Sequence, residues 1–278
     1  MRRAPAIPPL LLLLSVVTLT LPRAAAAQRS LAPLSPAEQS VTPVYEGWYR
    51  NHDGTYSLSF GYFNRNTTEV VDVPVGAENF ISPGKPNQGQ PSHFNPRRHW
   101  GVFAVVVPAD FGERKVTWSL KMRGQSYAIT GSLHRDWQID AIEGEASADN
   151  TPPEVRFAAD GAAGQGPLGV TAGPLRVAVG APLSVSVFVK DDGKAEPVAR
   201  SATPVDLTWF QHQGPGSVTF SPPASKLTAT GGTANVTATF SLPGEYLLRV
   251  RANDSPMVSA GHSQCCWTNG FVRVTVTP

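Results

Sequence analysis

EGWYRNHDGTYSLSFGYFNRN, at residues 46–66, is the stretch that decides the fold of the first half of the chain. Over positions 56–62, large apolar side chains alternate with serine and glycine, and this period of two places the large side chains on one face of a strand. Asp53-Gly54 precedes that strand, and Asp-Gly is a strong hairpin signal because both turn positions tolerate positive φ. Residues 44–49 supply the partner strand. A hairpin cannot bury an aromatic face alone, so the stretch predicts the nucleus of a β-sandwich.

The composition predicts the same fold class for the whole chain. Its 278 residues leave room for two ordinary domains. The 26 prolines and 25 glycines, with only 16% charged residues, are typical of many short strands joined by turns. We therefore predict an all-β protein, with two antiparallel β-sandwich domains in tandem after a signal peptide.

The N-terminus carries the pattern of an export signal. Two arginines are followed by an apolar run at residues 10–21 and by four alanines at 24–27 that offer a cleavage site. The apolar run is too short to span a bilayer comfortably. We predict a signal peptide at residues 1–27, no transmembrane anchor after its cleavage, and a secreted or periplasmic protein. Cleavage would remove three arginines and leave 20 basic residues against 21 acidic ones, which gives no electrostatic basis for binding nucleic acid.

Residues 28–42 are expected to form a loose leader, and residues 43–142 the first domain. Further short strands are predicted at residues 70–73, 100–107, 116–122 and 127–133. Residues 75–99 show no periodicity, and a loop of that length inside a compact domain is either packed against it or functional.

Four segments of this half resemble a module of bacterial exported and surface proteins. They are GYFNRN at 61–66, VPVGAENFISPG at 73–84, GQPSHFNPRR at 89–98 and VTWSL at 116–120. The resemblance covers residues 46–133. The module has no known activity, so the resemblance implies an exported protein and no chemistry.

The second half begins after a predicted linker at residues 143–153, which is rich in Glu, Ala, Ser and Pro. Within residues 154–278 the period of two returns in successive runs from Leu175 onward. Tyr246 opens one strand directly after Pro243-Gly244-Glu245, where the tyrosine corner of a sandwich would bond back to the chain. This half resembles the immunoglobulin-like and PKD-like domains of bacterial surface proteins. The residues that carry the likeness are VKDDG at 189–193, Trp209, GPGSVTF at 214–220 and PGEYLLR at 243–249.

The sequence contains no motif of a known catalytic class. G-x-S-x-G, H-E-x-x-H, G-x-x-x-x-G-K and C-x-x-C-H are all absent. GQGPLG at residues 164–169 matches the glycine pattern of a dinucleotide-binding loop, but Pro167 and the strand pattern after it exclude the helix that such a loop needs. We therefore do not expect an enzyme.

Cys265 and Cys266, the only cysteines, are adjacent. Neighbouring cysteines close only a strained ring, yet an exported chain favours oxidation. A vicinal disulfide that stiffens the last loop is the favoured interpretation. A bond to another chain, a reduced pair and, with His262, a copper or zinc site remain alternatives.

Acidic residues are expected near the same loop. In an immunoglobulin-like sandwich, the loops at residues 191–204 and 253–269 would lie at one pole, facing the first domain. Asp191, Asp192 and Asp254 would gather there, where their oxygens could bind calcium. Ordinary capping of turns by aspartate is the alternative. No other cofactor is predicted.

A second candidate site lies at the end of the long loop. His93, Arg97, Arg98 and Trp100 form a basic and aromatic patch that could stack on a sugar or bind an anion. The alternative is a strand start with arginines that cover apolar surface.

We therefore predict an exported, non-catalytic binding or structural module of the cell envelope or extracellular space. A carbohydrate or surface-polymer binding protein is the first alternative, and an enzyme or enzyme accessory domain with a site at the domain junction is the second. The expected partners are an envelope polymer, a carbohydrate or another surface protein.

Overall fold

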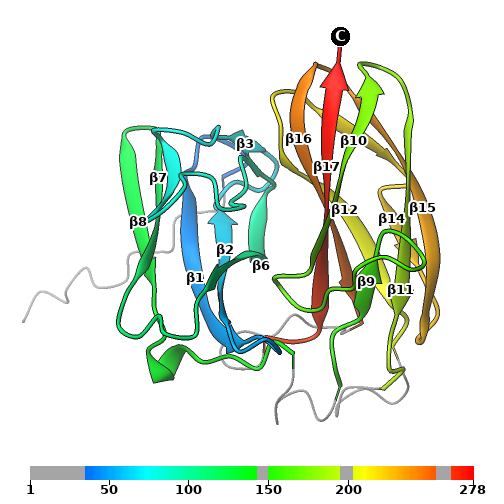
Figure 1. Cartoon of the computed structure of the whole chain (residues 1–278). Coiled ribbons are helices and arrows are strands. Elements are labelled where there is room, and N and C mark those ends of the chain that lie inside the picture. Colours follow the sequence, from blue (N-terminus) through cyan, green and yellow to red (C-terminus); the bar gives the residue numbers. More distant parts are fainter. Residues whose placement is uncertain (1–34, 143–149, 195–202, 255–263) are drawn as a thin grey trace, which may run out of the picture. The chain divides into compact units, whose positions relative to one another are not determined.

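The computed structural model describes residues 35–142, 150–194, 203–254 and 264–278 (Figure 1). The predicted signal peptide, most of the leader and residues 143–149 of the predicted linker lie outside the described residues. Leu34–Pro278 form one compact unit. The all-β class is confirmed, since the described elements are strands apart from the 3-10 helix η1 (Arg135–Trp137). No helix in the described ranges is long and apolar enough to cross a membrane.

Two three-stranded sheets, β1-β2-β6 and β4-β7-β8, form the first sandwich, and β3 and β5 pair beside them. The strands are β1 (Val41–Arg50), β2 (Tyr56–Asn64), β3 (Val71–Asp72), β4 (Asn79–Ser82), β5 (His93–Phe94), β6 (Arg97–Val107), β7 (Val116–Met122) and β8 (Gln125–Gly131). The hairpin predicted at residues 46–66 is confirmed as the antiparallel pair β1–β2, and the second predicted hairpin as β7–β8.

Aromatic side chains from both sheets fill the core of this sandwich. Phe60 and Phe103 stack with ring centroids 5.4 Å apart, and the edge of Trp118 packs against Phe103 at 5.2 Å. All three are buried. The alternation in the sequence therefore points the large side chains inward, as predicted.

The stretch without periodicity, residues 75–99, is packed. It contains β4 and β5, and β6 begins at Arg97, three residues before the predicted strand start. The buried Asn79 side chain donates to the Val73 and Pro91 carbonyls at 2.9 and 2.8 Å, and accepts from Trp118 Nε1 at 2.9 Å. Side-chain hydrogen bonds thus hold together a segment that has little regular backbone pairing.

The second sandwich packs the five-stranded sheet β10-β17-β16-β12-β14 on the four-stranded sheet β13-β15-β11-β9. Its strands are β9 (Glu154–Arg156), β10 (Val170–Ala178), β11 (Leu183–Lys190), β12 (Asp206–Gln213), β13 (Val218–Ser221), β14 (Ala224–Lys226), β15 (Gly231–Phe240), β16 (Gly244–Asn253) and β17 (Trp267–Thr277). One pairing departs from the predicted antiparallel pattern: β10 runs parallel to β17 (Figure 1).

Valines and one tryptophan, Trp209, form most of the core of this sandwich. Tyr246 is buried, and its hydroxyl donates to the Leu242 carbonyl at 2.8 Å, which confirms the predicted tyrosine corner. No helix follows the GQGPLG loop, because residues 166–168 form a turn and β10 begins at Val170.

Candidate functional site

Arg98, from the predicted patch, is occupied by protein partners. One of its guanidinium nitrogens donates to both carboxylate oxygens of Glu46 at 2.7 and 2.8 Å, and the guanidinium lies 4.6 Å from the centre of the Trp100 ring. Glu46 is buried, and burial raises its pKa while the charge of Arg98 opposes that rise. Arg98 therefore connects β6 to β1, and its guanidinium is not available to bind a ligand.

The other two basic residues of the patch lie apart from this pair. His93 Nδ1 lies 2.7 Å from a carboxylate oxygen of Asp72, across the β3–β5 pair. Arg97 is exposed, has a φ of 76°, and holds its guanidinium 5.6 Å from the centre of the Phe63 ring. Of the four predicted residues, only Arg97 presents a charged group to solvent without an ion pair in the described structure.

Buried hydrogen bonds join the two sandwiches, and we call the set centred on Gly101, His212 and Asn269 the seam. The Asn269 amide donates to the Gly101 carbonyl at 2.7 Å and to the Pro167 carbonyl at 2.9 Å. Gly101 has a φ of +46°, and a Cβ there would lie 2.5 Å from the Trp267 ring. Only glycine therefore allows β6 to approach β17 this closely.

Two histidines lie between the sandwiches: His212, already named as part of the seam, and His99. The His212 ring nitrogen Nε2 lies 2.7 Å from the Gly89 carbonyl, and the His212 carbonyl accepts from the Ser92 backbone N–H at 2.9 Å. His99 packs edge-on against Phe210 at 5.7 Å. Burial, and after it the positive charge of Arg249, lowers the pKa of both His99 and His212 to about 3. Both rings are therefore neutral at physiological pH.

A groove of about 510 Å³ lies beside the seam. Its aromatic lining residues, Phe103, Tyr246 and Phe271, are all buried, so none offers a face on which a sugar ring could stack. Among the described residues that line it, Glu245 is the one carboxylate. The groove thus lacks both the aromatic platform of a sugar site and the paired carboxylates of a glycosidase.

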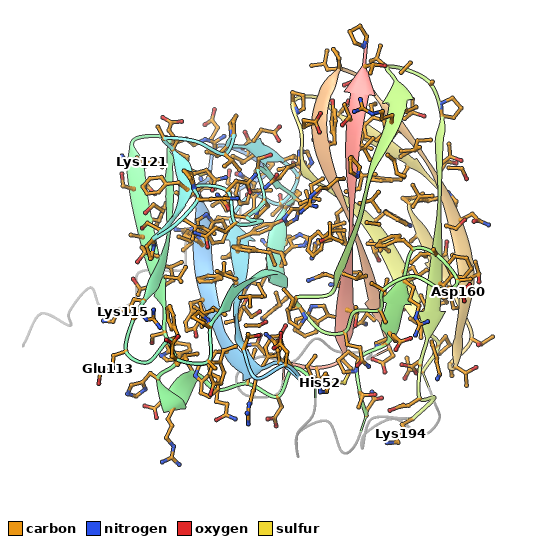
Figure 2. The ribbon with its side chains drawn as sticks, viewed as in Figure 1. His52, Glu113, Lys115, Lys121, Asp160 and Lys194 are labelled. Carbon is orange, nitrogen blue, oxygen red and sulfur yellow. A yellow bond between two sulfur atoms is a disulfide. The ribbon has the colours of Figure 1, made fainter. Side chains whose placement is uncertain are left out.

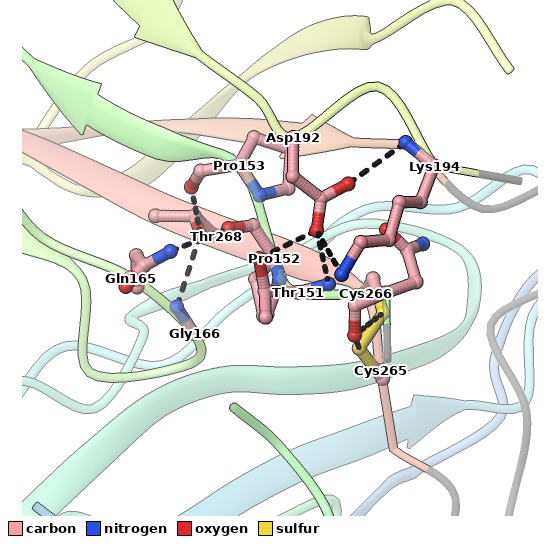
Figure 3. The surroundings of a disulfide bond; sticks show 11 residues. Thr151, Pro152, Pro153, Gln165, Gly166, Asp192, Lys194, Cys265, Cys266 and Thr268 are labelled. Atoms are coloured by element: carbon pink, nitrogen blue, oxygen red, sulfur yellow. Dashed lines mark hydrogen bonds and ion pairs between the residues drawn. A yellow bond between two sulfur atoms is a disulfide. The ribbon is translucent and has the colours of Figure 1, made fainter. Parts of the chain in front are cut away.

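The structure joins Cys265 and Cys266 in a disulfide at the start of β17 (Figure 3). Both cysteines are buried, and their sulfur atoms lie 3.8 and 3.7 Å from the Asn150 carbonyl oxygen. A disulfide has no S–H to donate, so these are packing contacts. Gln264, the preceding residue, donates its side-chain amide to the Glu46 carbonyl at 2.8 Å. The disulfide is therefore fixed between β17, β1 and the segment that leads into β9.

The three aspartates predicted at the pole lie within the described residues, whereas residues 195–202 and 255–263 of the two predicted loops lie outside them. Asp192 accepts from the Thr151 backbone N–H at 3.2 Å and from its hydroxyl at 3.0 Å (Figure 3). Asp191 accepts from the Gly193 N–H at 3.0 Å through one oxygen. Asp254 is buried at the end of β16, where its backbone N–H donates to the Cys266 carbonyl at 3.3 Å. Asp191 and Asp192 thus make the turn-capping contacts of the alternative interpretation.

Asp254 and Asn150 are unusual because neither side chain has a normal hydrogen bond. Their exposed fractions are 1% and 0%, yet both Asp254 carboxylate oxygens and both polar atoms of the Asn150 amide lack a hydrogen-bond partner of normal geometry. The two groups nevertheless face one another, since the Asn150 amide lowers the Asp254 pKa. Burial first, and then the nearby charge of Asp191, outweigh this and raise it to about 7. Sequence reasoning missed Asn150, because no local pattern places it beside Asp254.

No established chemical site emerges from the described residues. Within them, no group of three or more His, Cys, Asp or Glu side chains is arranged to hold a metal ion. His262, the third member of the copper or zinc alternative, lies outside the described residues.

Comparison with known proteins gives only distant likenesses. No family model matches the chain, and no curated protein matches it. Solved structures that resemble it include bacterial surface proteins. The D00–D0 domain of intimin is 15% identical, with 86% of this chain and 100% of that one covered and a TM-score of 0.28. The Yersinia pseudotuberculosis adhesin InvE is 12% identical, with 86% and 59% covered and a TM-score of 0.27.

Domains 4 and 5 of the S-layer protein SbsC are 12% identical, with 64% of this chain and 71% of that one covered and a TM-score of 0.26. We draw no inference on function from likenesses of this size. The strands, their pairing and the two cores described above establish the β-sandwich fold by themselves.

Proposed function

We propose that the protein is a non-catalytic structural module, exported to the cell envelope or the extracellular space, that holds two β-sandwiches as one rigid unit. The seam is the observation that carries this proposal. The side chains of Asn269 and His212 are buried and bond to the carbonyls of Gly101 and Gly89. Breaking them would leave buried donors and acceptors unpaired, at about 1–3 kcal/mol for each group.

The chemistry of the seam also fits a spacer better than a binding cleft. The Asn269 side chain already uses its amide nitrogen and its oxygen within the protein, and His212 uses its Nε2. The groove beside them offers no exposed aromatic ring. A rigid pair of sandwiches can hold its two ends at a fixed separation and orientation, which is what a structural module must do.

Distances between spin labels test the proposal. Lys115 in the first sandwich and Asp160 in the second are exposed (Figure 2), so cysteines introduced there can carry the labels. We expect one narrow distance distribution for the full chain. The double variant Asn269→Ala/His212→Ala should broaden it, whereas Lys121→Ala, at an exposed position of the first sandwich, should not. A broad distance distribution in the labelled chain without seam substitutions would contradict the proposal that the two sandwiches form one rigid unit.

Carbohydrate or polymer binding is the second candidate, because Arg97 is exposed and held over Phe63. An array of glycans and envelope polymers tests it with the mature chain. Binding that Arg97→Ala abolishes and Lys121→Ala leaves intact would favour this function. No binding to any polymer in the array would leave the structural module as the better account.

A further inference from the structure

Three side chains from separate parts of the second sandwich meet at the pole beside the disulfide. Asn150 precedes β9, Asp191 follows β11, and Asp254 follows β16. The three side chains are close enough to interact, since the Asn150 amide lowers the pKa of the Asp254 carboxyl and the charge of Asp191 raises it. The fold therefore brings together three oxygen-bearing side chains that the sequence separates widely.

Four of the side-chain oxygens in this group accept no hydrogen bond of normal geometry. Both carboxylate oxygens of Asp254, the Asn150 side-chain oxygen and one oxygen of Asp191 are buried and lack a hydrogen-bond partner. Buried carboxylates are stable only when they are paired, hydrogen-bonded or bound to a metal. Asp254, at 1% exposure, has nothing of this kind among the described residues other than the amide of Asn150.

We propose that this pole is a calcium site, with Asp254, Asp191 and Asn150 as its side-chain ligands. Calcium takes carboxylate and amide oxygens in a flexible arrangement of six to eight ligands, completed by backbone carbonyls and water. Magnesium requires a stricter octahedron and keeps its water, so it fits less well where two of the ligands are almost fully buried. Zinc and copper prefer nitrogen and sulfur, and the cysteines here are joined in a disulfide.

The neighbouring contacts hold the ligands in place. The Asp254 backbone is bonded to the Cys266 carbonyl, and both disulfide sulfurs pack on the Asn150 carbonyl. Asp192 fixes Thr151, the residue after Asn150, through two hydrogen bonds. Asp192 is thus a positioning residue, and the disulfide links two of the three ligands.

Metal-free full-length protein, prepared with EDTA and dialysed, tests the proposal by calorimetric titration with calcium chloride. We expect saturable binding of calcium at one site and a rise in melting temperature. Magnesium chloride should bind more weakly. Asp254→Asn should abolish the saturable heat, and Asp191→Asn should weaken binding by about tenfold or more. Asp160→Asn, an exposed acidic residue of the same sandwich (Figure 2), should change neither.

A second measurement distinguishes a metal ligand from a buried acid that is simply protonated. In EDTA at pH 8, Asp254→Asn should melt at a higher temperature than the natural chain, because it removes an uncompensated buried charge. In calcium the order should reverse. Calcium that neither binds nor raises the melting temperature of the natural chain overturns the proposal. So does an Asp254→Asn variant that still binds calcium with unchanged affinity.

The site stands apart from the proposed structural role. Loss of calcium binding would leave the seam and its rigidity untouched, and a broad label distribution would leave the calcium titration unaffected.

Discussion

At the scale of single residues, Trp118 has the clearest energetic role. Its side chain is 0% exposed, packs on Phe103 and donates to Asn79. We expect Trp118→Ala to lower the free energy of unfolding by about 3–5 kcal/mol, since it empties a large volume in a closed core. Trp137, which is 49% exposed, is the matched control. Urea titrations in which both variants lose the same small amount would contradict the assigned core.

The cysteine pair is the second feature at this scale. We expect the intact mass of the non-reduced protein to be that of a monomer two hydrogens lighter than the reduced form, with no thiol available for labelling. Reduction of the bond should change the melting temperature little, because a bond between adjacent residues removes little entropy from the unfolded chain. A covalent dimer on a non-reducing gel would instead make the pair a contact with a partner.

At the scale of elements, residues 75–99 depend on Asn79. Replacement by alanine would leave two carbonyls and the Trp118 indole N–H buried without partners. We expect Asn79→Ala to cost about 2–4 kcal/mol in free energy of unfolding. Lys85→Ala, on the exposed part of the same stretch, should cost less than about 0.5 kcal/mol. Chemical denaturation of both variants measures the difference. An equal loss of free energy of unfolding in both variants would mean that contacts other than those of Asn79 hold the segment in place.

The same segment shows where sequence patterns stop being informative. Both hairpins of the first sandwich could be predicted, because a period of two is local and Asp53-Gly54 and Arg123-Gly124 mark their turns. The packing of residues 75–99 could not, since it rests on side-chain bonds between Asn79 and carbonyls 6 and 12 residues away. The parallel pairing of β10 with β17 was missed for a different reason, because alternation of side chains does not encode strand direction.

At the scale of the whole molecule, the seam should make stability depend on pH. His99 and His212 have a pKa of about 3 in the folded state against about 6.5 in the unfolded chain. Between these values the unfolded state binds protons that the folded state does not. The contribution of the two neutral histidines to the free energy of unfolding is therefore fully present above about pH 6.5. It falls as the pH drops toward 3, by about 1.4 kcal/mol per pH unit for each histidine.

Urea titrations at several pH values between 7 and 4.5 measure this slope. A His99→Gln/His212→Gln variant should flatten it, and His52→Gln, an exposed histidine (Figure 2), should not. An unchanged slope in the double variant would show that other groups control the acid response.

The two sandwiches should differ when they are separated. The core of the second contains only its own residues, whereas the core of the first includes Phe271 from β17. We expect residues 151–278 to unfold cooperatively alone, and residues 28–145 to do so at a lower melting temperature than in the full chain. Calorimetry of both pieces measures this. If either piece is soluble only with the other, the predicted boundary at residues 143–153 is misplaced.

The sequence predicted the pole better than the seam. An immunoglobulin-like topology alone brings Asp191 and Asp254 to one end, and the structure places them there. The seam depends on contacts such as Asn269 with Gly101, which join positions 168 residues apart. No periodicity links such positions. The patch around Arg98 looked like a binding site because its partner, Glu46, lies in a different strand and is recognisable only after folding.

The parallel pairing of β10 with β17 gives the second sandwich a way to carry mechanical load. β17 is flanked by β10 on one side and by β16 on the other, almost along its whole length. Its hydrogen bonds run across the strand axis, so a pull along β17 loads many of them together in shear. A hairpin peeled from its end would instead lose them one at a time. The second sandwich should therefore resist tension along β17 more strongly than a force that peels the strand away from one end.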